Sequence, residues 1–266
     1  MAEEVVLVKI SGSVITDPET PNTARQHEIH RIVQEIKESK FAGRLIIGHG
    51  SGAFGHVPGH RYQVHKGLIN EESRKGASIT QNVAANLHRM VVGAMCDHEL
   101  NPLSFPPSAG AIAVDRKIMH WDLSPLKLAM ENGFVPVTLG DVVVDRKLGV
   151  TIVSTEEAFR FIASELKPRR IIIGGDTDGV FTSDPKAFPD AELISTIDSG
   201  NIGTAIAGAG GSRKVDVTGG MRSKLEFLYE MARNTGAVCQ IVNIAVHGRM
   251  RSAISGEEVI GTLIKG

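Results

Sequence analysis

A short glycine-rich run carries the clearest chemical signal in this chain. It reads Gly50-Ser51-Gly52-Ala53-Phe54-Gly55-His56 and directly follows the apolar run Leu45–Ile47, which is typical of a buried strand. Because glycine has no Cβ, successive backbone N–H groups can turn toward one anion, most often a phosphate. The run ends on His56, whose ring nitrogen can donate to the same anion. The pattern predicts an enzyme that acts on a phosphorylated small molecule.

The histidines of this region are expected to differ in role. His49 lies at the strand end and is expected to be a hydrogen-bonded core residue, whereas His56 is the candidate for the anion. His56 and His60 also have the i, i+4 spacing of some zinc sites. No glutamate-containing motif accompanies them, and Pro58 is expected to interrupt any helix, so no metal site built from protein ligands is predicted.

A lysine and two aspartates follow other predicted strands. Lys9 leaves the strand Val5–Ile10 beside the small-residue turn Ser11-Gly12-Ser13, from which an ammonium can reach phosphate oxygens. Asp176 and Asp178 follow the apolar run Ile171–Ile173. Their carboxylates suit magnesium or a ribose, and equally suit Asx turns.

A predicted helix start supplies a further cation. Thr218 is expected to cap a helix whose first amides belong to Gly219 and Gly220, with Lys224 one turn further on. A helix N-terminus stabilises an anion through its free amides and dipole, so Lys224 and these amides can share one phosphate.

The elements that must position these residues alternate between strand and helix from end to end. This order predicts an α/β protein, a three-layer αβα sandwich with a mainly parallel central sheet, whose strand ends and following loops share one edge. A lobe boundary is expected near residue 155. The Gly-rich segment Gly200–Lys214 is expected to be a surface loop, and Gly261–Ile264 a closing edge strand. The other predicted strands are Val135–Leu139, the hairpin Val142–Asp145 with Val150–Val153, and Val238–Asn243, and the predicted helices are Glu28–Lys37, Ser78–Leu100, Asp122–Asn132, Glu156–Leu166 and Gly220–Asn234.

Composition narrows the class of partner. The 266 residues carry a formal net charge of −1 and 5% aromatic residues, so neither a basic face nor a stacking surface for nucleic acid is expected. No apolar stretch approaches the roughly 18 residues of a membrane span, and no membrane partner is expected. The two cysteines, Cys96 and Cys239, are far apart, which favours reduced thiols in a cytoplasmic protein.

Taken in order, four segments resemble the amino acid kinase superfamily: Lys9–Ser13, the glycine run, Asp176–Gly179 and Asp216–Lys224. The end of the glycine run, Gly52-Ala53-Phe54-Gly55-His56, is similar to the isopentenyl phosphate kinases, and fosfomycin kinases are similar there. The resemblance implies transfer of the ATP γ-phosphoryl group to isopentenyl phosphate in isoprenoid biosynthesis, with magnesium bridging the β- and γ-phosphates. It also implies an acceptor lobe at 1–155, a nucleotide lobe at 156–266 and a homodimer.

The same resemblance assigns residues to roles. It makes Lys9, His56 and Lys224 catalytic, with His56 binding the acceptor phosphate. The remaining acceptor positions are Gly50, Ser51, Gly52, Gly55, Gly140 and Ser154. The nucleotide positions, besides the two lysines, are Ser11, Gly12, Ser13, Asp176, Asp178, Gly179, Lys186, Gly219 and Gly220.

Three positions depart from the family pattern. Ser11 stands where glycine is usual, no lysine follows Ser13 within a few residues, and Glu156 stands where an aspartate usually organises the catalytic lysines. Two alternatives therefore stay open beside the prenyl monophosphate kinase. One is a kinase for another small phosphate or phosphonate such as fosfomycin, and the other is a nucleotide-binding storage or regulatory protein without turnover.

Overall fold

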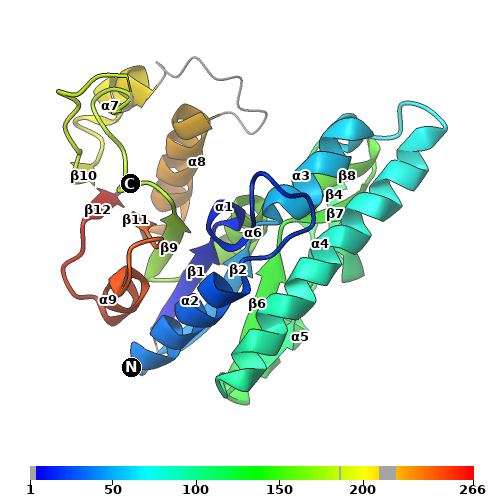
Figure 1. The fold of residues 1–266 in the computed structure, drawn as a ribbon, viewed down its shortest axis with the longest axis horizontal. Helices are drawn as coiled ribbons and strands as arrows, with labels where there is room; N and C mark the ends of the chain where they lie inside the picture. Colours follow the sequence, from blue (N-terminus) through cyan, green and yellow to red (C-terminus); the bar gives the residue numbers. More distant parts are fainter. Residues whose placement is uncertain (1–3, 186, 210–219) are drawn as a thin grey trace.

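The computed structural model describes residues 4–185, 187–209 and 220–266, and its core is one large sheet covered by helices on both faces (Figure 1). The eight strands lie in the order β10-β12-β11-β9-β1-β2-β6-β3, and all neighbours run parallel except β11 and β12. The strands of this sheet are β1 (Val5–Ile10), β2 (Arg44–His49), β3 (Pro102–Ser104), β6 (Val135–Leu139), β9 (Arg170–Gly175), β10 (Thr196–Ile197), β11 (Val238–Asn243) and β12 (Gly261–Ile264). The predicted αβα sandwich with a mainly parallel sheet is confirmed.

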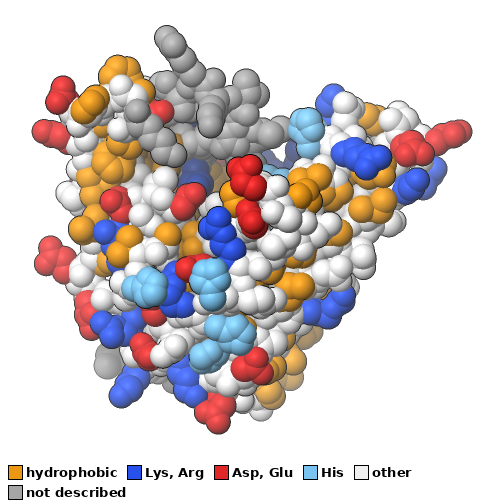
Figure 2. Space-filling view, viewed as in Figure 1, with side chains coloured by type: hydrophobic (Ala, Val, Ile, Leu, Met, Phe, Trp, Pro, Cys, Tyr) orange, Lys and Arg blue, Asp and Glu red, His pale blue; other side chains and the backbone are white. Residues whose placement is uncertain are grey.

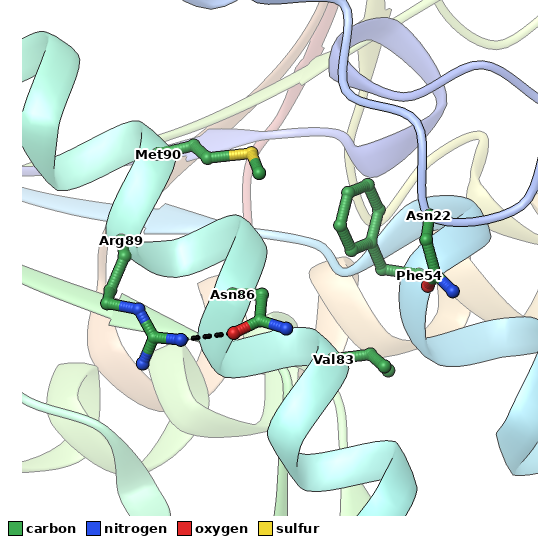
Figure 3. A pocket seen from close by; sticks show the side chains of 6 residues that line it. All are labelled: Asn22, Phe54, Val83, Asn86, Arg89 and Met90. Atoms are coloured by element: carbon green, nitrogen blue, oxygen red, sulfur yellow. Dashed lines mark hydrogen bonds between the residues drawn. The ribbon is translucent and has the colours of Figure 1, made fainter.

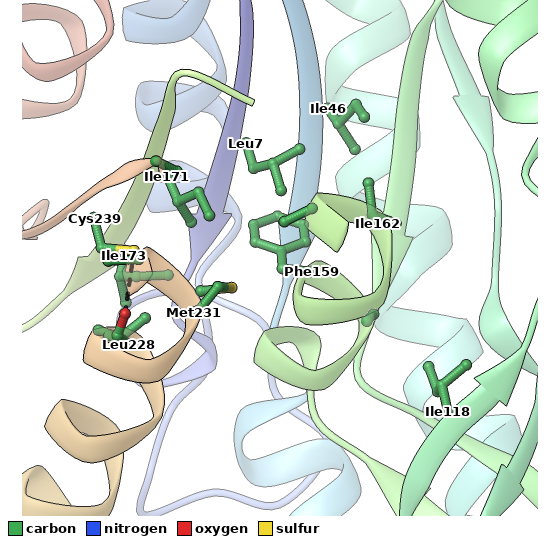
Figure 4. Packing of buried hydrophobic residues seen from close by; sticks show 14 of the residues in the cluster. Leu7, Ile46, Ile118, Phe159, Ile162, Ile171, Ile173, Leu228, Met231 and Cys239 are labelled. Carbon is green, nitrogen blue, oxygen red and sulfur yellow. Dashed lines mark hydrogen bonds between the residues drawn. The ribbon is translucent and has the colours of Figure 1, made fainter. Parts of the chain in front are cut away.

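The helices divide between the two faces according to the alternation of side chains along β1. Val6, Val8 and Ile10 point into a core shared with α2, α4 and α9, whereas Leu7 points into the core shared with α5, α6 and α8. Figure 4 shows the second core, in which Phe159 of α6 packs beside Leu7. The helices are α1 (Gly12–Ile15), α2 (Gln26–Glu38), α3 (Gly52–Arg61), α4 (Glu72–Asp97), α5 (Ser124–Glu131), α6 (Thr155–Leu166), α7 (Ile202–Ala209), α8 (Gly220–Thr235) and α9 (Arg249–Ser255), with 3-10 turns η1 (Val64–Lys66) and η2 (Pro107–Ala109).

A second sheet has four strands and contacts α4 through β7 (Asp141–Asp145). Two of its strands were predicted from the sequence and two were not. Its order is β5-β4-β7-β8, in which β7 and β8 (Gly149–Val153) form the expected antiparallel hairpin. The missed strands, β4 (Ile112–Val114) and β5 (Lys117–His120), are too short to show a clear alternation of apolar residues.

Several expectations about element boundaries are wrong. β12 is not the closing edge strand, because the two-residue β10 pairs outside it. Residues 202–209 of the predicted loop form helix α7, in which Ile202, Ala205 and Ile206 pack onto the core at helical spacing. The rest of that predicted loop, 210–214, lies outside the described residues.

Two helices are longer than predicted, and each contains a residue that usually disfavours a helix. Pro58 does not interrupt α3, which continues through it to Arg61 at the cost of one backbone hydrogen bond. α4 begins at Glu72 instead of Ser78, and Gly76 within it is explained by packing: a Cβ there would lie 2.2 Å from the Cβ of Tyr62.

Candidate active site

The candidate site lies at the point in the sheet where the strand order reverses. From β1 the chain passes to β2 on one side and later to β9 on the other, and the register aligns the end of β1 with the ends of both. Ile10 pairs with His49 of β2 and with Gly174 of β9. In parallel α/β sheets, ligands bind at the carboxyl ends of the strands at such a switch point.

Two glycine turns are packed against each other at this edge. A Cβ on Gly12 would lie 2.2 Å from the Gly52 nitrogen, and Gly52 itself has a φ of +47°. The two turns are also bonded through buried Thr16, whose hydroxyl donates to the Gly12 carbonyl at 2.7 Å and accepts from the Ala53 amide at 3.1 Å. Gly12 and Gly52 are therefore required for close approach of two backbones, and Thr16, which the sequence did not single out, joins them.

The amides of the glycine run do not all face the same way. The Gly50 N–H donates to the Ile10 carbonyl at 3.0 Å and so links the glycine run to β1. α3 begins at Gly52, and two amides of its first turn already have partners: Ala53 donates to the Thr16 hydroxyl and Phe54 to the Ser51 carbonyl. Gly55 is buried, and a Cβ there would lie 2.3 Å from the Ser51 hydroxyl oxygen.

His56 lies in the second turn of α3 with its side chain exposed. Figure 2 shows histidine side chains (pale blue) exposed among the charged residues on this face of the molecule. His49, in contrast, is fully buried, as expected: its Nε2 lies 2.8 Å from Nδ1 of His88. Burial, with a smaller effect of His88, lowers the pKa of His49 to about 3, and burial lowers that of His88 to about 4.

Charged groups meet on the other side of the same edge. The Lys9 ammonium, 10% exposed, forms an ion pair with Glu156 in the first turn of α6. Burial alone would raise the pKa of Glu156, but the nearby charges of Lys9 and Lys224 outweigh it and lower that pKa below its usual value. Lys9, Glu156 and Lys224 therefore form one group of charges, contributed by β1, α6 and α8.

The structure explains two of the positions that depart from the family pattern. Glu156 forms an ion pair with Lys9, and the charge of Lys224 also lowers its pKa, so the residue with one extra methylene still interacts with both lysines. Ser11 has φ −67° and ψ 136°, a conformation open to any residue, so glycine is not required there. Its hydroxyl lies 3.1 Å from that of Ser13.

Beyond β9, Asp178 is held by side chains that the sequence did not single out. Its carboxylate accepts from Arg249 of α9 and, at 3.0 Å, from the amide of Asn243 at the end of β11. Burial raises its pKa, but the hydrogen bonds of these two residues have the larger combined effect, and the pKa is lowered. Asn243 is the last residue of a predicted strand, and in the structure it pairs with Gly175 at this edge. Its place at a strand end is the signal by which the sequence could have identified it.

Several of the remaining predicted residues make hydrogen bonds or packing contacts within the fold. Gly179 has a φ of +144° and packs against Thr262, whose hydroxyl accepts from the Val180 amide. The Ser154 hydroxyl caps α6 by accepting from the Glu157 amide. The Gly140 amide donates to the His49 carbonyl. Asp176 is exposed. Lys186, Thr218 and Gly219 lie outside the described residues, while Gly220 begins α8.

One pocket of about 480 Å³ lies between α3, α4 and the loop before α2 (Figure 3). Phe54, Val83 and Met90 form its apolar part, and Asn22, Asn86 and Arg89 its polar part. Phe54 and His56 are two residues apart on α3 and so face opposite sides of the helix. The pocket therefore lies on the far side of α3 from the His56 side chain.

Comparison with known proteins identifies the family. The model of the amino acid kinase family matches residues 4–243, and the chain belongs to that family. It is 36% identical to isopentenyl phosphate kinase of Methanothermobacter thermautotrophicus over 98% of this chain and 99% of the relative. It is 32% identical to isopentenyl phosphate kinase of Thermoplasma acidophilum over 98% of this chain and the whole relative. A solved isopentenyl phosphate kinase structure superposes with a TM-score of 0.85 at 33% identity, covering 98% and 100% of the two chains.

Proposed function

We propose that this protein transfers the γ-phosphoryl group of ATP to isopentenyl phosphate and releases isopentenyl diphosphate and ADP. The observation that carries the proposal is the pairing of two unlike half-sites at one sheet edge. The glycine turns and His56 offer amides and an imidazole, and the Lys9–Glu156–Lys224 group offers two cations. The full-length similarity to isopentenyl phosphate kinases supports the choice of acceptor.

The chemistry needs positioning and charge neutralisation more than covalent help. Two anions must be brought in line while charge spreads over the transferred phosphoryl oxygens. In the proposal, Lys9 and Lys224 neutralise the nucleotide phosphates, and Glu156 holds the two lysines together. A phosphate monoester is already anionic near neutral pH, so no strong general base is required. His56 orients and neutralises the acceptor.

Magnesium would be carried by the nucleotide itself. Within the described ranges, no three His, Cys, Asp or Glu residues lie close enough to hold a metal ion. Asp178 already accepts from Arg249 and Asn243, which leaves it poorly suited as a ligand. When bound, Mg²⁺ would supply further neutralisation of the β- and γ-phosphates, and Lys9 and Lys224 would act beside it.

The prenyl tail is proposed to lie on the His56 side of α3, toward the second sheet. There the half-buried side chains of Tyr62, Val150 and Ile152 pack against a small apolar cluster. Gly59, one turn along from His56, comes close to this surface, because a Cβ on it would lie 3.0 Å from Ile152. The tail would pass along this cluster, away from the pocket at Phe54.

The division into an acceptor lobe at 1–155 and a nucleotide lobe at 156–266 belongs to the same proposal, although one sheet runs through both. A homodimer in the cytoplasm is also proposed. Leu103 on the edge strand β3 is exposed, as are Leu128 on α5 and Phe134 before β6, and such apolar surface suits an interface. Both cysteines are free thiols, as in a reducing compartment. No described helix is long and apolar enough to cross a membrane.

The direct test is a coupled ADP-release assay with ATP, Mg²⁺ and a panel of acceptors: isopentenyl phosphate, dimethylallyl phosphate, fosfomycin, N-acetylglutamate and UMP. Turnover confined to the prenyl monophosphates is expected. Faster turnover of fosfomycin would change the proposed acceptor to a phosphonate and leave the proposed mechanism unchanged. Retained ATP binding with no turnover of any acceptor would contradict the proposal and support a non-catalytic nucleotide-binding protein.

A further inference from the structure

A chain of hydrogen bonds leads from exposed Ser104 through two buried histidines to Gly50, in the glycine run before α3. The Ser104 hydroxyl of β3 lies 2.5 Å from Nε2 of His88, Nδ1 of His88 lies 2.8 Å from Nε2 of His49, and Nδ1 of His49 lies 3.2 Å from the Gly50 carbonyl oxygen. His49 and His88 are 0% and 6% exposed, and their rings stack with centroids 5.1 Å apart. Neither histidine has a role in the chemistry proposed above.

The direction of this chain is fixed at its inner end. A carbonyl oxygen only accepts, so Nδ1 of His49 must carry the proton. Burial lowers the pKa values of both rings to about 3 and about 4, so each is neutral near pH 7 and has a single N–H. His49 then accepts at Nε2 from Nδ1 of His88, and His88 accepts at Nε2 from the Ser104 hydroxyl. Every bond therefore runs inward, toward the Gly50 carbonyl.

Holding that carbonyl inward decides where the next amide points. The Gly50–Ser51 peptide is trans, so its C=O and N–H point in opposite directions. The preceding peptide, His49–Gly50, is fixed by the bond of the Gly50 amide to Ile10, and the bond of His49 Nδ1 to the Gly50 carbonyl restrains the Gly50–Ser51 peptide itself. With the carbonyl facing buried His49, the Ser51 N–H faces away from the core, at the start of α3.

We infer that His49 and His88 are positioning residues for the acceptor phosphate: their directed hydrogen bonds hold the Gly50 carbonyl inward and aim the Ser51 amide at the anion. The inference rests on the proposed function for the identity of the acceptor. A rotated peptide would instead present the carbonyl oxygen to the phosphate, where it repels the anion. The neutral pair thus acts through backbone geometry and needs no charge of its own.

The test compares steady-state kinetics of the full chain in four forms: wild type, His49→Leu, His49→Asn and His88→Leu. Asparagine can place an N–H donor near the position of Nδ1, whereas leucine has none. We expect His49→Leu to raise the KM for isopentenyl phosphate about five- to tenfold, the usual effect of one hydrogen bond, with the KM for ATP within about twofold of wild type. His49→Asn should restore most of the loss, and His88→Leu should give a smaller increase.

Met95→Ala, a buried truncation elsewhere on α4, controls for lost stability, and it should lower Tm while leaving both KM values unchanged. The inference is overturned if His49→Leu behaves like Met95→Ala, or if His49→Asn is no better than His49→Leu.

A second readout separates this inference from the identity of the acceptor. The ¹⁵N-labelled Ser51 amide resonance is followed during titration with inorganic phosphate, which needs no turnover. A shift in wild type that is reduced in His49→Leu supports the positioning role even if the acceptor assay fails. Absence of a shift in the wild-type protein contradicts it even if isopentenyl phosphate is turned over.

Discussion

In the proposed function, the two halves of the site bind phosphate by different physical means. On the nucleotide side, charges face each other: Lys9 and Lys224 around Glu156, and Arg249 on Asp178. On the acceptor side, the contacts among buried groups are neutral: glycine backbones in contact, Thr16 between them, and the uncharged His49–His88 pair below. The difference teaches that the nucleotide half depends on charge number and the acceptor half on backbone shape.

The largest expected effect comes from removing a charge. Lys9→Met should lower kcat by about 10²- to 10³-fold, because one preorganised cation at the transferring group is lost. Lys224→Ala should raise the KM for ATP and lower kcat together. Steady-state kinetics with ATP as the varied substrate measure both, and Lys75→Met, an exposed lysine on α4, is the matched control. Unchanged ATP kinetics in both variants would contradict the charge-based half of the comparison.

A smaller effect, confined to the other substrate, is expected from filling the space between the two glycine turns. A methyl group on Gly12 would lie 2.2 Å from the Gly52 nitrogen, so Gly12→Ala must push the turns apart. The resemblance assigns Gly12 to the nucleotide, but its Cβ would push against the Gly52 turn of the glycine run, so we expect the KM for isopentenyl phosphate to rise about tenfold or more and nucleotide affinity to fall less. Gly93→Ala is the control, because its Cβ would meet nothing within 4 Å. Equal loss for both substrates would mean that the turns serve the whole site.

The smallest effect concerns stability and pH. His49 and His88 have lowered pKa values in the folded protein, near 3 and 4, but about 6.5 when unfolded. The unfolded chain therefore binds protons first as the pH falls, and the free energy of unfolding declines below about pH 6.5, until about pH 4 through His88 and about pH 3 through His49. Each histidine should contribute a loss of about 1.4 kcal/mol between pH 7.5 and pH 5.5.

Urea unfolding at these two pH values measures this loss. The double variant His49→Asn/His88→Leu should lose most of the pH dependence, although it is less stable at both values. Met95→Ala, which removes no titratable group, should lower the free energy of unfolding at both pH values and leave its pH dependence unchanged. An identical pH dependence in the double variant and the wild type would show that the buried pair is not neutral in the folded protein.

The sequence predicted the bounds of several strands well, because an apolar run marks the strand and a change of composition marks where it ends. β1, β6, β11 and β12 have the predicted bounds, since each is a short apolar run with a clear change of composition at both ends. The order Lys9, glycine run and Asp178 along parallel strands was enough to place them at one edge. The kinase family and the contact of Glu156 with Lys9 followed from the same residues.

Other features needed three-dimensional contacts. Thr16 looks like an ordinary loop residue, and only the approach of two turns gives its hydroxyl a donor and an acceptor. His88 lies inside a long helix, 39 residues from His49, so no spacing rule connects them. Arg249 belongs to a short helix with little periodicity. Such tertiary hydrogen bonds leave no local pattern, which is why the sequence did not reveal Thr16, His88 and Arg249.

The most direct test of the division between the two halves is calorimetric titration of wild type and His56→Ala with each ligand separately. His56 is exposed on α3, on the acceptor side, so its removal is expected to weaken isopentenyl phosphate binding about tenfold or more and to change ATP affinity by less than twofold. An equal loss of affinity for ATP and isopentenyl phosphate would contradict the assignment of His56 to the acceptor, and with it the separation of a shape-based acceptor half from a charge-based nucleotide half.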